Sequence, residues 1–552
     1  MNSTDEPGNG VRSEEPVTIV PVAGRQDLAE WAWVALVSSA ILLFSSIPYL
    51  VGYMAQTTDY QFGGAVFDRQ DYAVHLATMQ LGLRGEWAYR LRFTSEDHPG
   101  AYVKLAYIFL GHVAGWTGLS LPATYQMARV LFGLAACLLI YVLAKEFFTR
   151  QADRRWAFLL VIGGSGLGWL QLMFGWLPNL GISPADFWMV DAYVFFGFLT
   201  FPHFAFVTAL LTGMLELFLD HLRRPAWWKA ALIVLAGALL QLVQPYAPLI
   251  ADLVLAGSVL AVAAKKQVMP WNPFLALGAI YAAQIPLLVY NLVVFQSHPV
   301  WRAFASQNST LSPPPIYYLL GFGLIWPLAI LGAVKILRTP DPARWACLVW
   351  VVGVPALAYL PINIQRRFML AYSLPLGLVA SVGLIEVVIP WLHSHASLWV
   401  SQRVDIGRYI YLILCALSSI YLVSGTAWVI ASGASSFFDP ASLLMAVDWL
   451  ATNSEIDDIV LSAELTGQVL AARTGLRVFF GHPIETIEYR EKARQVEEFY
   501  TGRSTQDWLK NCTCQWVILG PEEMKISVGA TPLADLQPVY DRKSVRIYRI
   551  RP

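Results

Sequence analysis

Long apolar segments dominate this sequence and set the strongest limit on its fold. About eleven of them are long enough to cross a bilayer as helices, at 31–54, 124–147, 156–176, 201–221, 229–245, 248–264, 272–293, 315–337, 345–361, 368–389 and 409–432. Hydrophobic residues make up 56% of the chain and charged residues 14%, whereas a soluble domain carries about 25% charge. The sequence therefore predicts an α-helical polytopic membrane protein with about eleven spans.

Lysine and arginine are distributed unevenly over the loops between these segments. One set of alternate loops holds Lys145, Arg150, Arg154, Arg155, Arg223, Arg224, Lys229, Lys265, Lys266, Lys335, Arg338, Arg344, Arg403 and Arg408. Because cytoplasmic loops are enriched in these residues, we expect the N-terminus to be cytoplasmic. The pattern holds only if the short apolar segment 102–115 does not cross, so we expect an interfacial or half-inserted helix there. Residues 1–28 are then a disordered cytoplasmic leader, 29–436 the membrane domain and 55–100 its first external loop.

The character of the chain changes after about Phe437, where the apolar segments shorten and charges return. Segments 458–462, 515–519 and 546–550 are predicted strands, and 487–500 is a predicted amphipathic helix. We therefore expect residues 437–552 to form a small extracytoplasmic α/β domain. This region has no nucleotide-binding motif, and its Cys512 and Cys514 lack the second pair that a zinc site requires.

Two acids, Asp68 and Asp71, lie three residues apart in the first external loop. Most loop charges simply solvate a surface, but acids near hydrocarbon often mark function. A carboxylate close to a second negative group can serve as a general base. Together with Asp191, these two acids are also candidate ligands for a divalent metal, Mg²⁺ or Mn²⁺, which is possible but not required.

Arg366 and Arg367 lie on the predicted outer side, against the charge rule. The planar fork of arginine suits phosphate, so both are candidates for binding a donor phosphate; alternatively, one of them pairs with a loop carboxylate. Four further candidates for a pocket or acceptor site lie near outer helix ends, at Asp191, His203, Gln244 and Tyr246. His203 fits an ordinary capping or core histidine as well as a group that lines a cavity.

Outward-facing acids and cations in a membrane protein match the needs of one reaction. A sugar donor carried on a polyprenyl phosphate needs cations for its phosphate, and an acceptor hydroxyl needs a general base. Inverting transfer needs one such base and no covalent intermediate. A transporter or flippase of a lipid-linked glycan is the alternative, but transporters usually place charges within their helices and show repeats. A sensor or scaffold whose external domain binds a partner is a third possibility.

Several short motifs, in order along almost the whole chain, resemble those of the GT-C superfamily of polytopic glycosyltransferases, especially its uncharacterised bacterial members. They are DYAVHLATM at 71–79 with Gly82, GEW at 85–87, SGLGW at 165–169, PHF at 202–204, QRRF at 365–368 and GHP at 481–483. This superfamily includes the protein O-mannosyltransferases, the aminoarabinose lipid A transferases and the oligosaccharyltransferase catalytic subunits. Its members carry an essential acid in the first external loop, juxtamembrane helices and a soluble domain after the last span.

The resemblance implies specific roles for residues of this sequence. Asp71 is the better match to the essential acid and Asp68 the second. Asp191 falls where relatives place a second acid. Glu96, Asp97 and His98 occupy the place where relatives often have a His-Pro-Pro run, although only one proline follows them here, and they are further candidates for the pocket or acceptor site.

The resemblance also implies the partners and the location. The partners are a lipid-linked sugar donor, membrane lipid, and a protein, lipid or glycan acceptor. The protein is expected in the cytoplasmic membrane, with its C-terminal domain outside.

The net charge of the chain is zero, so its charge gives no argument that it binds nucleic acid.

Overall fold

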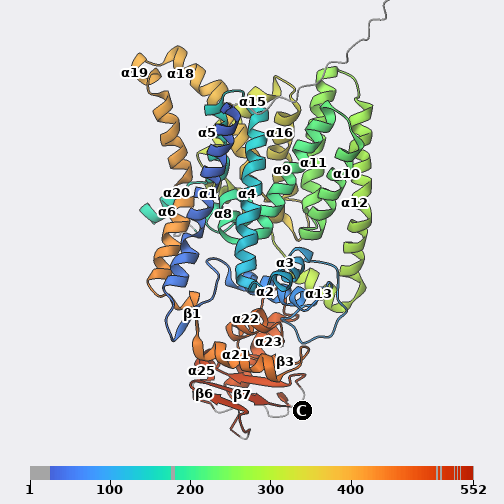
Figure 1. Ribbon diagram of the computed structural model, residues 1–552, viewed down its shortest axis with the longest axis vertical. Coiled ribbons are helices and arrows are strands. Elements are labelled where there is room, and N and C mark those ends of the chain that lie inside the picture. Colours follow the sequence, from blue (N-terminus) through green and yellow to red (C-terminus); the bar gives the residue numbers. More distant parts are fainter. Residues whose placement is uncertain are drawn as a thin grey trace, which may run out of the picture.

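The computed structural model describes residues 25–175, 181–504, 508–509, 512–527, 529–530, 533–534 and 536–550. Figure 1 shows a bundle of long helices with a small mixed domain at one end. Most of the predicted cytoplasmic leader, residues 1–24, lies outside the described residues.

Within the described residues, seven helical segments are long and apolar enough to cross a membrane, which makes this a multi-pass membrane protein. They are α1 (Arg25–Met54), α4 (Leu121–Phe147), α9 (Pro202–Arg223), α11 (Ala247–Lys266), α12 (Trp271–Ser297), the continuous segment of α17 (Ser373–Val382), η4 (Gly383–Val388) and α18 (Ile389–His395), and α20 (Val404–Ala431).

The other four predicted spans are helical but shorter or broken. Two of them are α10 (Trp227–Val243) and α16 (Pro342–Leu357). A third divides into α5 (Gln151–Gly163) and α6 (Gly168–Phe174), and the fourth into α14 (Pro315–Phe322) and α15 (Ile325–Leu337), which meet at 92°. Among the described residues, seven segments are therefore long enough to span without a break, eight spans result if the bent pair counts as one, and the remaining predicted spans are shorter or divided helices.

The two breaks pack against each other. Gly323, at the sharp bend, has φ +38°, a conformation that favours glycine. The N–H of Leu167 donates to the carbonyl of Leu320 at 2.8 Å. A Cβ atom on Gly166 would lie 2.1 Å from the carbonyl oxygen of Gly321, so the backbones can meet only because no side chain intervenes.

The predicted interfacial helix is α3 (Leu105–Thr117), which packs against α2 (Arg69–Leu83) at the end of the bundle nearest the C-terminal domain (Figure 1). The crossing needs two glycines. A Cβ on Gly82 would lie 1.9 Å from the carbonyl oxygen of Ile108, and one on Gly111 would lie 2.0 Å from that of Met79. Shorter elements complete the helical part, namely η1 (Ala185–Phe187), η2 (Val190–Ala192), α8 (Val194–Thr200), α13 (Pro299–Gln307), η3 (Gln365–Met369), α19 (Leu398–Ser401) and η5 (Ser435–Phe437).

The C-terminal domain is a five-stranded sheet in the order β4-β3-β5-β7-β6, with helices on both faces. The strands are β3 (Ile459–Leu461), β4 (Arg477–Val478), β5 (Trp516–Leu519), β6 (Tyr540–Arg542) and β7 (Val545–Arg549), of which β4, β3 and β5 run parallel. The helices are α21 (Ala441–Asn453), α22 (Glu464–Thr474), α23 (Tyr489–Tyr500) and α25 (Pro521–Ser527). The three strands and the amphipathic helix expected from the sequence are all present.

The loop 55–100, predicted to be the first external loop, joins this domain to the membrane helices. Its strand β1 (Tyr60–Phe62) pairs antiparallel with β2 (Phe438–Pro440), which directly precedes the domain. The apolar face of α2, with Ala73, Val74 and Ala77, is part of the same core as helices α21 and α22. Helix α2 is thus held between the two parts of the molecule.

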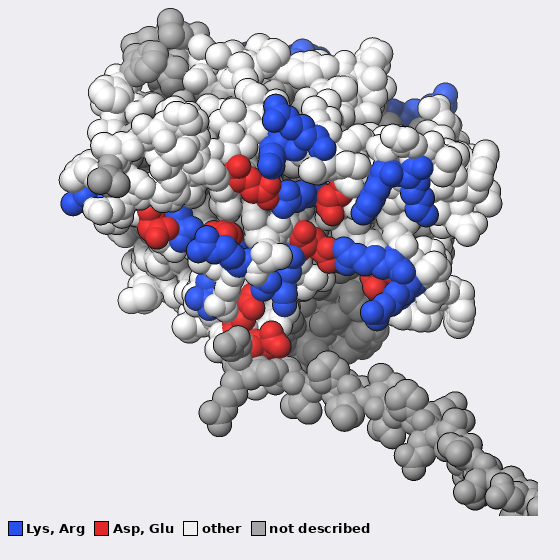
Figure 2. All heavy atoms as spheres, turned by 90° about the horizontal axis from the view of Figure 1, so that it is seen from above, with Lys and Arg blue, Asp and Glu red and all other residues white. Residues whose placement is uncertain are grey.

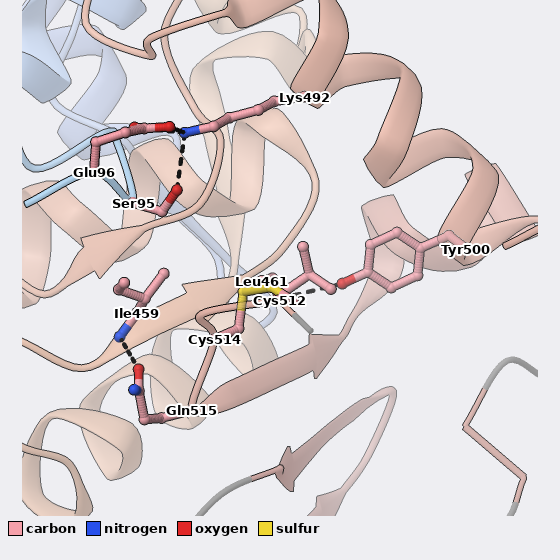
Figure 3. The surroundings of a disulfide bond; sticks show 9 residues. All are labelled: Ser95, Glu96, Ile459, Leu461, Lys492, Tyr500, Cys512, Cys514 and Gln515. Atoms are coloured by element: carbon pink, nitrogen blue, oxygen red, sulfur yellow. Dashed lines mark hydrogen bonds and ion pairs between the residues drawn. A yellow bond between two sulfur atoms is a disulfide. The ribbon is translucent and has the colours of Figure 1, made fainter. Parts of the chain in front are cut away.

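Cys512 and Cys514 form a disulfide beside the sheet, close to Leu461 and Tyr500 (Figure 3). The Tyr500 hydroxyl donates to the carbonyl of Leu461 at 3.2 Å.

The opposite end of the bundle is rich in charge. Figure 2 shows Lys and Arg side chains gathered over that face with Asp and Glu among them. Several are paired there: Arg344 with Glu386 at 2.6 Å, Lys229 with Asp220 at 2.6 Å, and Arg223 with Glu146. The loops predicted to be cytoplasmic supply these cations.

Candidate functional site

A cavity of about 210 Å³ lies where α2, the start of α9, η2, η3 and the C-terminal domain meet. It brings together eight of the residues singled out in the sequence. They are Asp68, Asp71, Asp191, His203, Gln244, Tyr246, Arg366 and Arg367.

The two loop acids are fixed by the start of α2. Asp68 is the N-cap residue, and its carboxylate accepts the backbone N–H of Asp71 at 3.1 Å. Asp68 has φ +38° and ψ 73°, in the left-handed region. Such a conformation costs a non-glycine residue about 1–2 kcal/mol and is found disproportionately at functional sites. The helix start therefore holds both carboxylates at the cavity wall.

His482 reaches Asp71 from the C-terminal domain. Its Nε2 atom lies 3.4 Å from Asp71 Oδ1. Its Nδ1 atom accepts the N–H groups of Ile484 at 3.1 Å and Glu485 at 3.2 Å, so the ring proton lies on Nε2. Only 4% of His482 is exposed. The histidine is thus held as a hydrogen-bond donor directed at the Asp71 carboxylate.

The surroundings shift the pKa values of the two acids in opposite directions. Burial and the charge of Asp71 raise the pKa of Asp68. For Asp71, burial acts to raise the pKa, but the hydrogen bond from His482, together with the nearby basic groups of which Lys104 is one, outweighs it and lowers the pKa well below its ordinary value. Asp71 is therefore ionised at neutral pH, and Asp68 is the stronger base of the two. Paired carboxyls with separated pKa values are typical of acid–base sites.

Arg366 and Arg367 supply positive charge to the same cavity. Arg367 donates from Nε to Thr310 Oγ1 at 3.2 Å and from Nη2 to Asn308 Oδ1 at 2.7 Å, and both partners are uncharged. The Arg366 guanidinium lies over the ring of Trp188, 5.3 Å from its centroid. Within the described part of the chain, neither arginine has a carboxylate within ion-pair distance.

Asp191 is the acid whose charge these arginines influence most clearly. Burial raises the pKa of Asp191, and the positive charges of Arg366 and Arg367 oppose that rise. Its backbone carbonyl accepts the N–H of Ala371 at 2.8 Å, which ties η2 to the segment that carries the arginines.

Among the solved structures that match this chain, two share its fold over most of its length. The Archaeoglobus fulgidus oligosaccharyltransferase in its apo form matches with a TM-score of 0.51 and 13% identity, over 89% of this chain and 70% of that one. ArnT from Cupriavidus metallidurans, bound to undecaprenyl phosphate, matches with a TM-score of 0.50 and 10% identity, over 93% of this chain and 98% of that one. Both are GT-C glycosyltransferases. This chain has the GT-C fold. No protein-family model and no curated protein matches the sequence.

A cluster of rings lines the GT-C cavity beside Asp71. His75 lies one helical turn after Asp71 and stacks on Tyr107, with ring centroids 4.0 Å apart. The Tyr107 hydroxyl lies 2.5 Å from His203 Nδ1, so His203 both lines the cavity and is bonded within it. Burial lowers the pKa of His75 well below its ordinary value, which keeps the ring neutral. The sequence reasoning missed His75, although its spacing of four from Asp71 places both on one helix face.

His482 and the Lys104–Glu485 ion pair were also missed. His482 belongs to the GHP motif at 481–483, but nothing in that motif says which part of a GT-C fold it faces. The Tyr89 hydroxyl donates a hydrogen bond to Glu485, and Lys104 pairs with the same carboxylate. The charge of Glu485 is therefore balanced by its neighbours in and beside the cavity wall.

Glu96, Asp97 and His98 do not line this cavity. Glu96 pairs with Lys492 at 2.7 Å (Figure 3) and Asp97 with Arg477 at 2.7 Å. His98 Nε2 accepts the N–H of Leu91 at 2.9 Å. Glu96 and Asp97 therefore connect the loop 55–100 to the C-terminal domain, and His98 makes a contact within that loop.

The candidate metal ligands Asp68, Asp71 and Asp191 all line the cavity. No group of three His, Cys, Asp or Glu side chains within the described residues has the spacing to hold a metal ion. The charges that the cavity offers to an anion are those of its arginines.

Proposed function

We propose that this protein is a membrane glycosyltransferase that moves a sugar from a polyprenyl-phosphate-linked donor to an acceptor hydroxyl, with inversion, at the extracytoplasmic face. One observation carries the proposal. A single cavity of a GT-C fold contains a fixed, ionised Asp71 together with two arginines that form no ion pair within the described part of the chain. The similar ArnT structure is bound to undecaprenyl phosphate, which is a lipid phosphate of the proposed class.

In this mechanism Arg366 and Arg367 bind the donor phosphate and stabilise the charge that grows on it as the bond to the anomeric carbon breaks. The acceptor oxygen attacks that carbon from the opposite face, and its proton passes to the Asp71 carboxylate. The products are the glycosylated acceptor and the polyprenyl phosphate. Asp68 orients the acceptor or tunes Asp71, and His75 and His203 shape the cavity wall.

The test is mass spectrometry of cell-surface glycans and lipids in cells with and without the gene. A glycan or lipid that loses one sugar on deletion, and regains it with the parent gene but not with Asp71→Asn, supports the proposal. Identical profiles in deleted and parent cells would count against it.

The orientation follows from the same proposal. We expect Ser504→Cys, in the C-terminal domain, to react with a membrane-impermeant thiol reagent in intact spheroplasts, because the charge-rich face of Figure 2 is then cytoplasmic. A cytoplasmic cysteine introduced at Lys265 serves as the matched control. If Ser504→Cys reacted only after permeabilisation, the C-terminal domain would be cytoplasmic and the proposed topology would be wrong.

His482 is expected to set the pH dependence of the reaction. His482→Leu removes the donor to Asp71, so the pKa of Asp71 should rise. The base must be ionised, so activity falls as pH drops through this pKa, and the acid limb of the kcat profile should move to higher pH. His482→Gln is the matched control, since it also loses the Nδ1 contacts but keeps an N–H that can reach Asp71. Identical acid limbs in the two variants would exclude this role.

A further inference from the structure

A second cavity, of about 380 Å³, lies against a different face of α2 from the first. The first cavity is lined by Asp68, Asp71 and His75, whereas the second is lined by Tyr72, Leu76 and others of the adjacent face. Its other walls come from the ends of α1 and α4 and from α21 and α22 of the C-terminal domain. The two cavities are therefore separated by one helix.

Two buried polar atoms of this wall have no partner within the described structure. They are the Tyr72 hydroxyl and the Gln468 amide oxygen, and the two residues are only 4% and 1% exposed. An unpaired buried polar group costs about 1–3 kcal/mol, so such groups call for an explanation. The hydroxyl packs closely against Gly64, also in the wall, where a Cβ would lie only 2.6 Å from it. A hydroxylated ligand would satisfy both atoms.

The rest of the lining is polar but electrically balanced. Three more glutamines, Gln56, Gln61 and Gln80, line the cavity. Gln56 accepts the N–H of Phe62 at 3.2 Å and Gln80 donates to the carbonyl of Arg473 at 2.6 Å, whereas Gln61 is exposed. Its Arg69 pairs with Asp439, which also lines it. Arg473 pairs with Asp448, with Nη2 and Oδ2 2.8 Å apart. No charge is left for an anion, in contrast to the arginines of the first cavity.

Aromatic rings complete this lining. Tyr53 and Phe62 lie at the wall with ring centroids 5.3 Å apart. Amide side chains both donate and accept hydrogen bonds, and aromatic faces pack against C–H surfaces. Together they match a neutral ligand that carries many hydroxyl groups on an apolar ring.

We propose that this second cavity binds a carbohydrate. The inference concerns binding alone and stands whether or not the protein transfers a sugar. Gln468 also connects the two cavities, because its Nε2 donates to the carbonyl of Gly481 at 3.0 Å, next to His482. The carbohydrate can be part of a lipid-linked glycan or a free saccharide, and both would present the same hydroxyl groups.

The test is binding of the purified full chain in nanodiscs to an array of immobilised bacterial oligosaccharides. Calorimetry with the best free oligosaccharide, and with the same glycan on a polyprenyl carrier in vesicles, follows. Binding of both forms identifies a saccharide site, and binding of the vesicle form alone identifies a lipid-linked glycan.

Tyr72→Phe is the decisive variant, because it removes only an unpartnered buried hydroxyl, so the melting temperature of the ligand-free protein should not fall and is expected to rise. We expect it to weaken binding about 10-fold, the value of one hydrogen bond. Gln61→Leu, at an exposed position, is the second variant, and Arg302→Gln, outside both cavities, is the control.

The proposal is overturned if the parent binds no glycan, or if both variants bind as the parent does. It is also overturned if Arg367→Gln loses binding while Tyr72→Phe keeps it, because the glycan then lies in the first cavity. Loss of sugar transfer without loss of glycan binding would bear only on the proposed function.

Discussion

Asp71→Asn is expected to lower kcat by about 10²–10⁴, the usual contribution of a positioned general base. Asparagine keeps the size of the side chain and an oxygen that can accept the His482 proton, but it removes the charge and the basicity. Folding should persist, because Asp71 opens on the cavity with 49% of its side chain exposed and is not part of a core. The measurement is single-turnover transfer by monodisperse protein from a radiolabelled polyprenyl-phosphate donor.

Asp59→Asn is the matched control, since Asp59 is an exposed acid in the same external loop. Asp68→Asn should cost less than Asp71→Asn if Asp68 tunes its neighbour. The raised pKa of Asp68 gives the competing outcome a physical basis, because the stronger base accepts a proton more readily. Loss of activity in Asp68→Asn alone would identify Asp68 as the general base. Full activity in Asp71→Asn would show that Asp71 is not the general base.

The helical architecture could be predicted from the sequence because a helix that crosses a bilayer requires a long apolar run. Such a run is a property of consecutive residues. The breaks could not be read in this way. The segment 156–176 has the length and composition of a span, yet it divides where Gly166 meets Gly321. That contact joins residues about 150 positions apart, and only the packed structure brings them together. Sequence pattern fixes which residues are apolar, but not which backbones meet.

The candidate site was predictable where a residue type contradicted its surroundings. Asp68 and Asp71 are acids beside hydrocarbon, and Arg366 and Arg367 are cations on the predicted outer face, and all four line one cavity. His482 gives no such signal, because its role depends on the docking of a domain from the other end of the chain. Asp97 shows the opposite error, since a charged loop residue beside the site serves an ion pair with Arg477.

The double variant Arg366→Gln, Arg367→Gln is expected to lower kcat/KM for the lipid donor by more than either single change. Each single change should lower it by about 10- to 100-fold, because a hydrogen bond to a charged group contributes about 1.5–3 kcal/mol. The guanidinium groups are available for a phosphate because Arg367 is held by the uncharged Asn308 and Thr310 rather than by an acid. Glutamine keeps hydrogen-bonding capacity and removes the charge, so it isolates the electrostatic contribution.

The separate effects of these changes on KM and on kcat then distinguish two roles for Arg366 and Arg367. If the arginines bind the phosphate equally in the ground state and the transition state, KM for the donor rises and kcat stays constant. If they mainly stabilise the charge that develops on the leaving phosphate, kcat falls as well. Arg302→Gln is the matched control, since Arg302 is an exposed arginine of α13 that does not line the cavity. If donor kinetics were unchanged in both single variants and in the double variant, Arg366 and Arg367 would not bind the donor phosphate. The mechanism would then lack the phosphate-binding group that it places in the same cavity as Asp71.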